Sequence, residues 1–401
     1  MPLADIEVTL TDQEREIRDS ARRFAEKVMR PAGIALDRLP DPADVIAPGS
    51  VLWDVFRQHR ELDLDVLDYA GPELTPLERS RLRFLVCEEL GWGDAGLAIS
   101  LGVAGFHKMF AQMSARPALM ERFGTAENRD IGCWAVTEPD HGSDSLTVTE
   151  RHFGDPKLKA NCVALRDGDE FVINGQKSAW VSDGTIATVA TLFCTVDPSQ
   201  GFKGGGVCLV PLDLPGVSRG KPLDKLGQRA LNQGEIFFDH VRISADYMIV
   251  GPDAYAMVVE AVLTMANASM GAIFVGLGRA ALELALAYAK ERVQGGVPII
   301  EHQSVKARLF KMFMQVEAAR SLAWRVMLYN STNPPLVQYS IASKVFCTNT
   351  AFEVASAALQ VFGGNGLTRE YPIEKMLRDA RASMIEDGCN DVLSIVGAAK
   401  L

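Results

Sequence analysis

The chain has 401 residues, which is enough for two or three domains with sizeable hydrophobic cores. Its apolar fraction of 48% and charged fraction of 23% are those of an ordinary folded protein, not of a disordered or fibrous one. The formal net charge of −10 argues against a nucleic-acid or anionic-membrane partner, because such partners bind a basic face.

The first part of the chain, residues 1–130, is predicted to be a helical domain. The run Thr11 to Glu14 has the Thr-x-x-Glu pattern of a capping box, and Pro31 is expected to end the first helix or to begin the next. Apolar residues follow the capping box at the spacing of one helix face: Ile17, Ala21, Phe24 and Val28.

Residues 131–246 are predicted to form a compact antiparallel β domain. The segments 162–165 and 171–173 flank the turn sequence Asp167-Gly168-Asp169, which predicts a β-hairpin. Further short apolar or alternating runs at 188–196, 207–211 and 235–238 are separated by Gly- and Pro-rich turns.

Residues 247–401 return to helical patterning and predict a four-helix bundle. The segment 261–278 has no charged residue and is as long as a membrane span, but it contains Thr, Asn, Ser and Gly and is bounded by Glu260 and Arg279. A helix buried in the centre of a bundle is therefore favoured over a membrane span. The three regions together predict an α+β protein in the order helical, β, helical.

The cysteines and the N-terminus bear on the compartment. The seven cysteines are scattered without a CxxC pair, which indicates reduced thiols and no metal site. Residues 1–9 are mixed polar and acidic and resemble neither an export signal nor a transit peptide. A cytoplasmic protein is expected.

The junction between the first two regions carries the sequence VTEPDHGSD, from Val136 to Asp144. A loop rich in Pro, Gly, Ser and Asp offers backbone N–H groups that can hold an anion or the edge of a flavin. On composition alone, a purely structural turn is the commoner outcome for such a segment.

The C-terminal segment identifies a family. It reads LQVFGGNG from Leu359, then EYPIEK from Glu370, RDA from Arg378 and IEDG from Ile385. With VTEPDHGSD, with INGQKSAWVSDG from Ile173 and with Glu291-Arg292, it resembles the signature of the acyl-CoA dehydrogenase flavoproteins. These ordered motifs span essentially the whole chain, and the family's helical, β, helical layout agrees with the predicted order.

The resemblance implies a set of FAD contacts. It places Trp134, Thr137, Gly142 and Ser143 around the isoalloxazine, with Trp180 and Ser182 beside flavin N5. One extra residue separates Lys177 from Trp180 relative to the commonest family pattern, so a register shift is possible there. The remaining implied contacts meet the FAD of a neighbouring subunit or its phosphates: Arg292, Gln360, Gly363, Gly364 and Cys389.

The resemblance also implies a reaction, in which a carboxylate removes the α-proton of an acyl thioester and the β-hydrogen leaves as hydride to flavin N5. The family's glutamate base is replaced here by Asp387, whose side chain is one methylene shorter. Three alternatives follow: a shifted backbone lets Asp387 reach, Glu386 replaces it, or this loop does not carry the base. The long-helix position that holds the base in some relatives is Ala266, which has no carboxylate.

The implied enzyme is an oxidoreductase acting on CH–CH groups. Its expected substrate is an acyl-CoA or acyl-carrier-protein thioester, its electron acceptor an electron-transfer flavoprotein, and its assembly a homodimer or homotetramer. Two other classes remain open at this point: the same fold with monooxygenase or redox-neutral desulfinase or elimination chemistry, and a non-catalytic flavin-binding scaffold.

Overall fold

A computed structural model describes residues 9–64 and 74–401. Residues 1–8, on which the expectation about targeting segments rests, lie outside the described part. The N-terminal region is helical, as predicted, and the capping box is formed because Thr11 Oγ1 accepts from the Glu14 N–H while the Glu14 carboxylate accepts from the Thr11 N–H. Its helices are α1 (Asp12–Phe24), α2 (Arg30–Asp37), α3 (Val51–Glu61), α5 (Pro76–Gly93), α6 (Ala95–Ala104), α7 (Phe106–Ser114) and α8 (Pro117–Phe123).

A twisted sheet follows, with its strands ordered β6-β7-β3-β1-β4-β5-β8 and β2 beside β3 and β4. Its strands are β1 (Gly132–Ala135), β2 (Val163–Asp167), β3 (Glu170–Ser182), β4 (Val189–Thr195), β5 (Gly205–Pro211), β6 (Val217–Arg219), β7 (Gln233–Ser244) and β8 (Met248–Val250).

Two details of the sheet differ from the prediction. The sheet is not purely antiparallel, because β4 pairs in parallel with both β1 and β2. It also extends four residues beyond the expected boundary at 246, since β8 pairs with β5. The predicted hairpin is present: β2 and β3 pair antiparallel around Gly168, whose φ of 64° suits a glycine in the turn.

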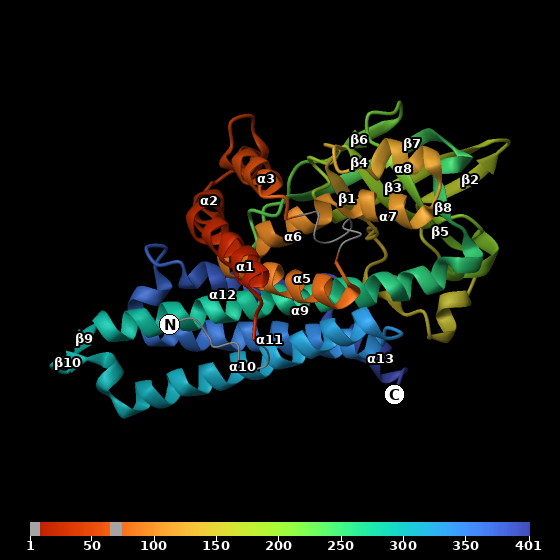
Figure 1. Ribbon diagram of the computed structural model, residues 1–401. Coiled ribbons are helices and arrows are strands. Elements are labelled where there is room, and N and C mark those ends of the chain that lie inside the picture. The colour runs from red at the N-terminus through yellow and green to blue at the C-terminus, as the bar shows by residue number, and fades with distance from the viewer. Residues whose placement is uncertain (1–8, 65–73) are drawn as a thin grey trace.

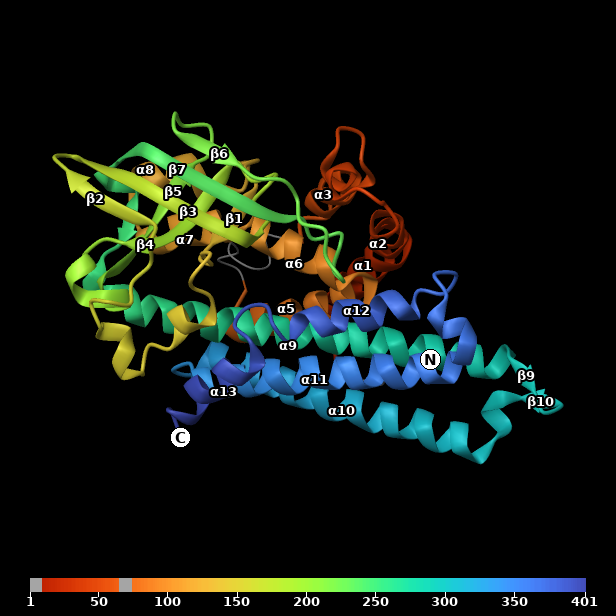
Figure 2. The same ribbon diagram turned by 180° about the vertical axis from the view of Figure 1, so that it is seen from behind.

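The C-terminal region is a bundle of long helices that runs beneath the sheet and the N-terminal helices (Figure 1). It comprises α9 (Pro252–Glu291), the short hairpin β9 (Val293–Gln294) and β10 (Val297–Pro298), α10 (Gln303–Thr332), α11 (Val337–Phe362), α12 (Ile373–Ser383) and α13 (Asn390–Ala398). The hairpin lies at the end of the bundle far from the sheet, as both views show (Figure 2).

The helix α9 is the central element of the bundle. It and α11 are long and apolar enough to span a membrane by length and composition, but 78% of the α9 window is buried inside the protein. Its contact with α5 is close because both helices carry glycine there. A Cβ on Gly276 would lie 2.0 Å from the Glu88 carbonyl oxygen, and one on Gly91 would lie 2.0 Å from that of Ile273. The observed burial agrees with the predicted bundle interior.

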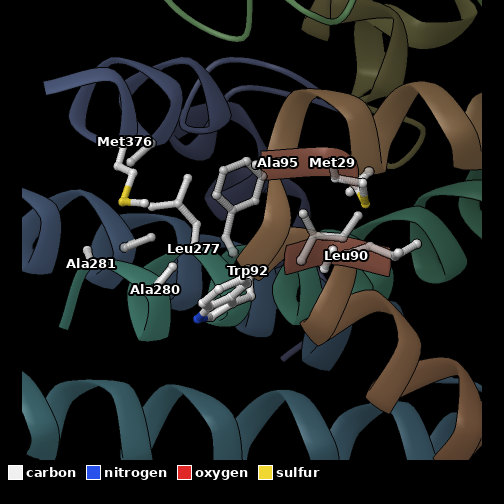
Figure 3. Close-up of a cluster of buried hydrophobic side chains, with 14 of the residues drawn as sticks. Met29, Leu90, Trp92, Ala95, Leu277, Ala280, Ala281 and Met376 are labelled. Carbon is white, nitrogen blue, oxygen red and sulfur yellow. The ribbon is translucent and has the colours of Figure 1, made fainter. Parts of the chain in front are cut away.

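One core joins the N-terminal helices to the bundle. Trp92 and Leu90 of α5 pack with Met29, with Leu277 and Ala280 of α9 and with Met376 of α12 (Figure 3). Burial of each Leu or Met side chain in this set stabilises the fold by about 1.5–3 kcal/mol. The packing fixes α12 on the bundle and thereby the start of the turn that follows it.

Candidate active site

A cavity of about 350 Å³ lies between the sheet and the turn that joins α12 to α13. This size falls within the range of small-molecule sites, and its lining combines aromatic and aliphatic surface with a few polar groups. The lining residues used below are Trp134, Thr137, Gly142, Ser143, Trp180, Ser182, Lys225, Gln228, Gln233, Glu386 and Asp387.

The six residues predicted to surround the flavin ring all line this cavity. Trp134 on β1 packs against Phe106 with ring centroids 5.4 Å apart, and its indole N–H is buried without a hydrogen-bond partner among the described residues. Trp180 on β3 also lines the cavity, and 56% of its surface is exposed. An unpaired buried donor beside aromatic surface fits a planar, polar-edged ligand, and an isoalloxazine has that character.

The extra residue before Trp180 is absorbed by a β-bulge. After an earlier irregularity between Ile173 and Gly175, pairing of β3 with β7 continues to Lys177, breaks a second time, and resumes at Val181 opposite Gly234. Ala179 lies in the break with a φ of 55°. Ser182 is therefore in register with both Trp134 and Gln233, which brings the two motifs together despite the insertion.

Two consecutive side-chain hydrogen bonds orient Ser182. The Gln233 side-chain amide donates to Ser182 Oγ at 3.1 Å, and the Lys225 ammonium donates to the Gln233 side-chain oxygen at 2.7 Å. Because Ser182 Oγ accepts from Gln233, its own proton remains to be donated elsewhere. We did not predict Lys225 or Gln233 from the sequence, and no motif drew attention to them.

Asp387 and Glu386 lie in the turn between α12 and α13. Asp387 has a φ of 52°, a left-handed conformation that Asp adopts more readily than most residues, and Gly388 continues it with a φ of 88°. The Glu386 carboxylate accepts from the Gln228 side chain at 2.5 Å. Gln228 is in turn fixed by a hydrogen bond from its backbone N–H to Asp379 on α12.

Both carboxylates are shifted toward the neutral form. Burial raises the pKa of Asp387 to about 6, although the nearby charge of Lys344 opposes the rise. Burial, reinforced by the Asp387 charge, raises the pKa of Glu386 to about 7, against the hydrogen bond from Gln228. A carboxylate with a pKa near neutrality is suited to accept a proton at physiological pH.

A second, smaller cavity of about 90 Å³ adjoins the first and shares Trp134 and Asp387 with it. Its remaining lining is mostly apolar, chiefly from α5, α6 and α9, and includes Ala266; the polar side chains in it are His59, Arg83 and Ser269. The position that bears a carboxylate in some relatives thus faces the same space as Asp387 but presents only a methyl group.

Cys389 and Ser143 connect the turn to the loop after β1. The Cys389 N–H donates to Ser143 Oγ at 2.9 Å, so the two predicted residues are neighbours. Two further positions are Gly295, in the turn after Arg292, and Asn267, next to Ala266 on α9. Gly295 and Gly296 form the β9–β10 turn with φ values of 66° and 84°, which glycine adopts without strain. Asn267 is fully buried in α9, and its side-chain oxygen has no partner among the described residues.

The remaining predicted FAD contacts do not reach this cavity. Arg292, Gln360, Gly363 and Gly364 are exposed at the end of the bundle that carries the β9–β10 hairpin (Figures 1 and 2). They lie near one another, because Tyr288 stacks on Phe362 with centroids 4.0 Å apart and its hydroxyl accepts from Asn365. Within one chain, the predicted contacts therefore fall into two separate groups.

Comparison with known proteins identifies the family. The acyl-CoA dehydrogenase middle-domain model matches residues 133–241, and the C-terminal-domain model matches residues 256–401. Human mitochondrial short-chain specific acyl-CoA dehydrogenase is 28% identical, over 98% of this chain and 91% of its own length. The chain belongs to the acyl-CoA dehydrogenase family.

Two solved structures support the same conclusion. Butyryl-CoA dehydrogenase from Megasphaera elsdenii superimposes with a TM-score of 0.86 at 25% identity, covering 98% of this chain and 99% of that one. A chain in the structure of the electron transferring flavoprotein of Acidaminococcus fermentans superimposes with a TM-score of 0.84 at 25% identity, with 98% of both chains covered. The protein is accordingly a flavin-dependent oxidoreductase that acts on the CH–CH bond of acyl-CoA thioesters.

Proposed function

We propose that this chain dehydrogenates a short acyl thioester at Cα–Cβ with Asp387 as the base. The observation that carries the proposal is the place of Asp387, the one titratable side chain that lines both cavities among the described residues. A ligand that extends from the aliphatic cavity into the larger one passes this carboxylate. Ala266 faces the same space and supplies no carboxylate there.

Asp387 has three properties that a base for this reaction needs. It lies at the cavity junction, its pKa is raised to about 6 by burial, and its backbone is held in a tight turn between two helices. The shorter side chain requires the backbone itself to bring the carboxylate close. FAD, when bound, supplies the acceptor for the β-hydride. The chain's own residues hold the thioester and take the α-proton.

The cofactor contacts proposed for a single chain are the six residues at the cavity. Ser182 retains a hydroxyl proton and Trp134 an unpaired indole N–H, so both can donate to the polar edge of a flavin. Gln233 and Lys225 hold Ser182 in place through their hydrogen bonds. Cys389 and Ser143 tie the base turn to the loop after β1, which places the proton acceptor and the flavin contacts in one unit.

A short acyl group is proposed because the aliphatic cavity is small, about 90 Å³. Two similar proteins are named for short-chain and butyryl substrates, which agrees with this size. The carrier is CoA or an acyl-carrier protein, since both present the same phosphopantetheine thioester. An electron-transfer flavoprotein is proposed as the electron acceptor, and the similarity to a chain solved with such a protein supports it.

We further propose a homodimer or homotetramer in which the exposed group of Arg292, Gln360, Gly363 and Gly364 completes the FAD site of a neighbouring copy. Arg292 suits a diphosphate because its planar guanidinium can form two parallel hydrogen bonds. The two glycines let backbone approach the cofactor without a Cβ between them.

The test is an anaerobic titration of the purified holoprotein with saturated acyl-CoA thioesters of increasing chain length. We expect loss of the visible absorbance band of the oxidised flavin with a short thioester and progressively less loss with longer ones. If no acyl-CoA bleaches the flavin but an acyl-carrier-protein thioester does, the carrier is the acyl-carrier protein. A flavin that neither bleaches overturns the proposed dehydrogenation.

A further inference from the structure

Lys344 on α11 is a fully buried lysine directly beneath the base turn. Its ammonium donates to the Gly388 carbonyl oxygen and to the Asn390 side-chain oxygen, each at 2.8 Å. Neither acceptor is charged, and among residues 9–64 and 74–401 no carboxylate lies within ion-pair distance of the ammonium. Asn390 is itself fixed because its amide donates to Thr348 and Asn349.

A buried ammonium without a direct ion pair is costly, because burial removes its hydration and neutral acceptors replace only part of it. Lysine is almost never fully buried unless a charge compensates it. The nearby anionic groups are Asp387 and Glu386, one and two residues before the Gly388 carbonyl that Lys344 holds. The Lys344 ammonium therefore lies close enough to Asp387 and Glu386 to interact electrostatically with both carboxylates, although it forms no direct ion pair with either.

We propose that Lys344 is a positioning residue for the dehydrogenation. It anchors the turn through the Gly388 carbonyl and the start of α13 through Asn390, and its positive charge keeps the Asp387 side chain ionised and ready to accept the α-proton. The inference rests on the proposed role of Asp387 as the base.

The charged groups around Asp387 come from several elements. Lys344 lies on α11, Glu386 on the same turn, Lys225 in the β6–β7 connection and Arg381 on α12, while Arg83 on α5 and His59 on α3 line the smaller cavity with Asp387. Of these, Lys344 is the one whose charge acts appreciably on Asp387 against burial.

Lys344 and Asp387 share a pH window in which both are charged. Burial lowers the pKa of Lys344 to about 8, while the charges of Asp387, Glu386 and Cys389 oppose that fall. Burial raises the pKa of Asp387 to about 6. Between these values the ammonium and the Asp387 carboxylate are both ionised. Removal of the Lys344 charge must raise the pKa of Asp387, so that the carboxylate stays protonated to higher pH.

The experiment measures the rate of anaerobic flavin reduction by a short acyl-CoA against pH. Lys344→Gln removes the charge and keeps a donor, whereas Asn390→Asp keeps the lysine and neutralises its charge with an adjacent carboxylate. In both variants we expect the acid limb of the profile to move up by about one pH unit, which is about tenfold in rate on that limb. Lys203→Gln removes an exposed lysine charge elsewhere and should leave the limb in place.

A second readout does not depend on turnover. A bound 3-oxoacyl-CoA has an acidic α-proton but no β-hydride to give, so its ionisation to the enolate reports proton transfer at equilibrium. The pH at which half of the bound ligand is ionised should move upward in both variants and not in Lys203→Gln. Chemical reduction by dithionite and the bound flavin content show whether each variant still folds and holds its cofactor.

The outcomes separate the two proposals. If Asp387→Asn is reduced by acyl-CoA as fast as the parent, Asp387 is not the base and the proposed function fails. If Asp387→Asn is inactive but both charge variants keep the parent's acid limb and enolate titration, the role of Lys344 is overturned. If Lys344→Gln does not fold, Asn390→Asp alone decides the question.

Discussion

The two groups of predicted FAD contacts have different surroundings. The group at the cavity comes from β1, β3 and the loop after β1, and its members meet around one space of about 350 Å³. The group at the end of the bundle, which includes Arg292 and Gln360, is exposed and lines neither that cavity nor its smaller neighbour.

The difference distinguishes the flavin-ring contacts, which one chain assembles by itself, from the FAD contacts that it exposes to a neighbouring copy. Strand pairing brings Trp134 opposite Ser182, so hydrogen bonds within the chain assemble the flavin-ring contacts. Arg292 directly follows α9 with its side chain exposed, and it does not line either cavity at the base turn. We therefore expect substitutions in the first group to affect chemistry and those in the second to affect cofactor retention.

The largest effect is expected at the cavity. Asp387→Asn removes the proposed base while keeping the size of the side chain, so anaerobic reduction of the flavin by a short acyl-CoA should slow by about 10²–10⁴-fold. Rapid-mixing absorbance spectroscopy measures the rate. Flavin content should be unchanged, because the substitution does not alter the exposed group.

Glu386→Gln is the matched control for Asp387→Asn. It removes the other carboxylate of the same turn and retains an oxygen that can accept from Gln228. A reduction rate that falls less than about tenfold would support Asp387 as the base. A larger loss in Glu386→Gln than in Asp387→Asn would assign the base to Glu386 instead.

A smaller effect is expected at the end of the bundle. Arg292→Gln removes a guanidinium proposed to bind the diphosphate of a neighbouring copy's FAD. Loss of one charge-assisted hydrogen bond costs about 1.5–3 kcal/mol, which is about 10–100-fold in FAD affinity. Equilibrium dialysis of the apoprotein against FAD measures the change.

Lys290→Gln serves as the control for Arg292→Gln, because it removes an exposed charge two residues earlier on the same helix. Its FAD affinity should match that of the parent. If both variants lose the same FAD affinity, the effect is a general one of charge. If Arg292→Gln keeps the affinity of the parent, the exposed group does not contribute to FAD binding.

Much of the fold could be predicted because local chemistry determines it. The Thr11 capping box, the Gly168 hairpin and the uncharged 261–278 segment each depend on a few neighbouring residues, and each prediction agrees with the structure. The parallel pairing of β4 with β1 was not predicted, because it depends on strand order and leaves no local turn signal.

The site could be predicted only where a motif marked it. Trp134 and Ser182 belong to recognisable blocks, whereas Lys225 and Lys344 reach the site from segments whose residues carry no chemical pattern of their own. A lysine on a helix is an ordinary surface residue by composition, and only tertiary packing buries Lys344 beneath Gly388. Site residues that make their contacts across a long sequence separation therefore could not be predicted from the sequence alone.

The smallest effect is expected at the bulge that aligns the cavity group. Ala179 has a φ of 55°, which costs a residue with a Cβ about 1–2 kcal/mol, whereas glycine adopts it freely but loses more chain entropy on folding. Ala179→Gly should thus raise the free energy of unfolding by at most about 1 kcal/mol, and Ala179→Val should lower it because a β-branched residue is more strained there. Denaturant unfolding of both holoproteins measures the two changes.

The flavin spectrum should remain that of the parent in Ala179→Gly, because the register of Ser182 with Gln233 resumes beyond the bulge. A stability order with valine above alanine would show that the bulge does not hold this conformation, and the alignment of Trp180 with the cavity would then need another cause.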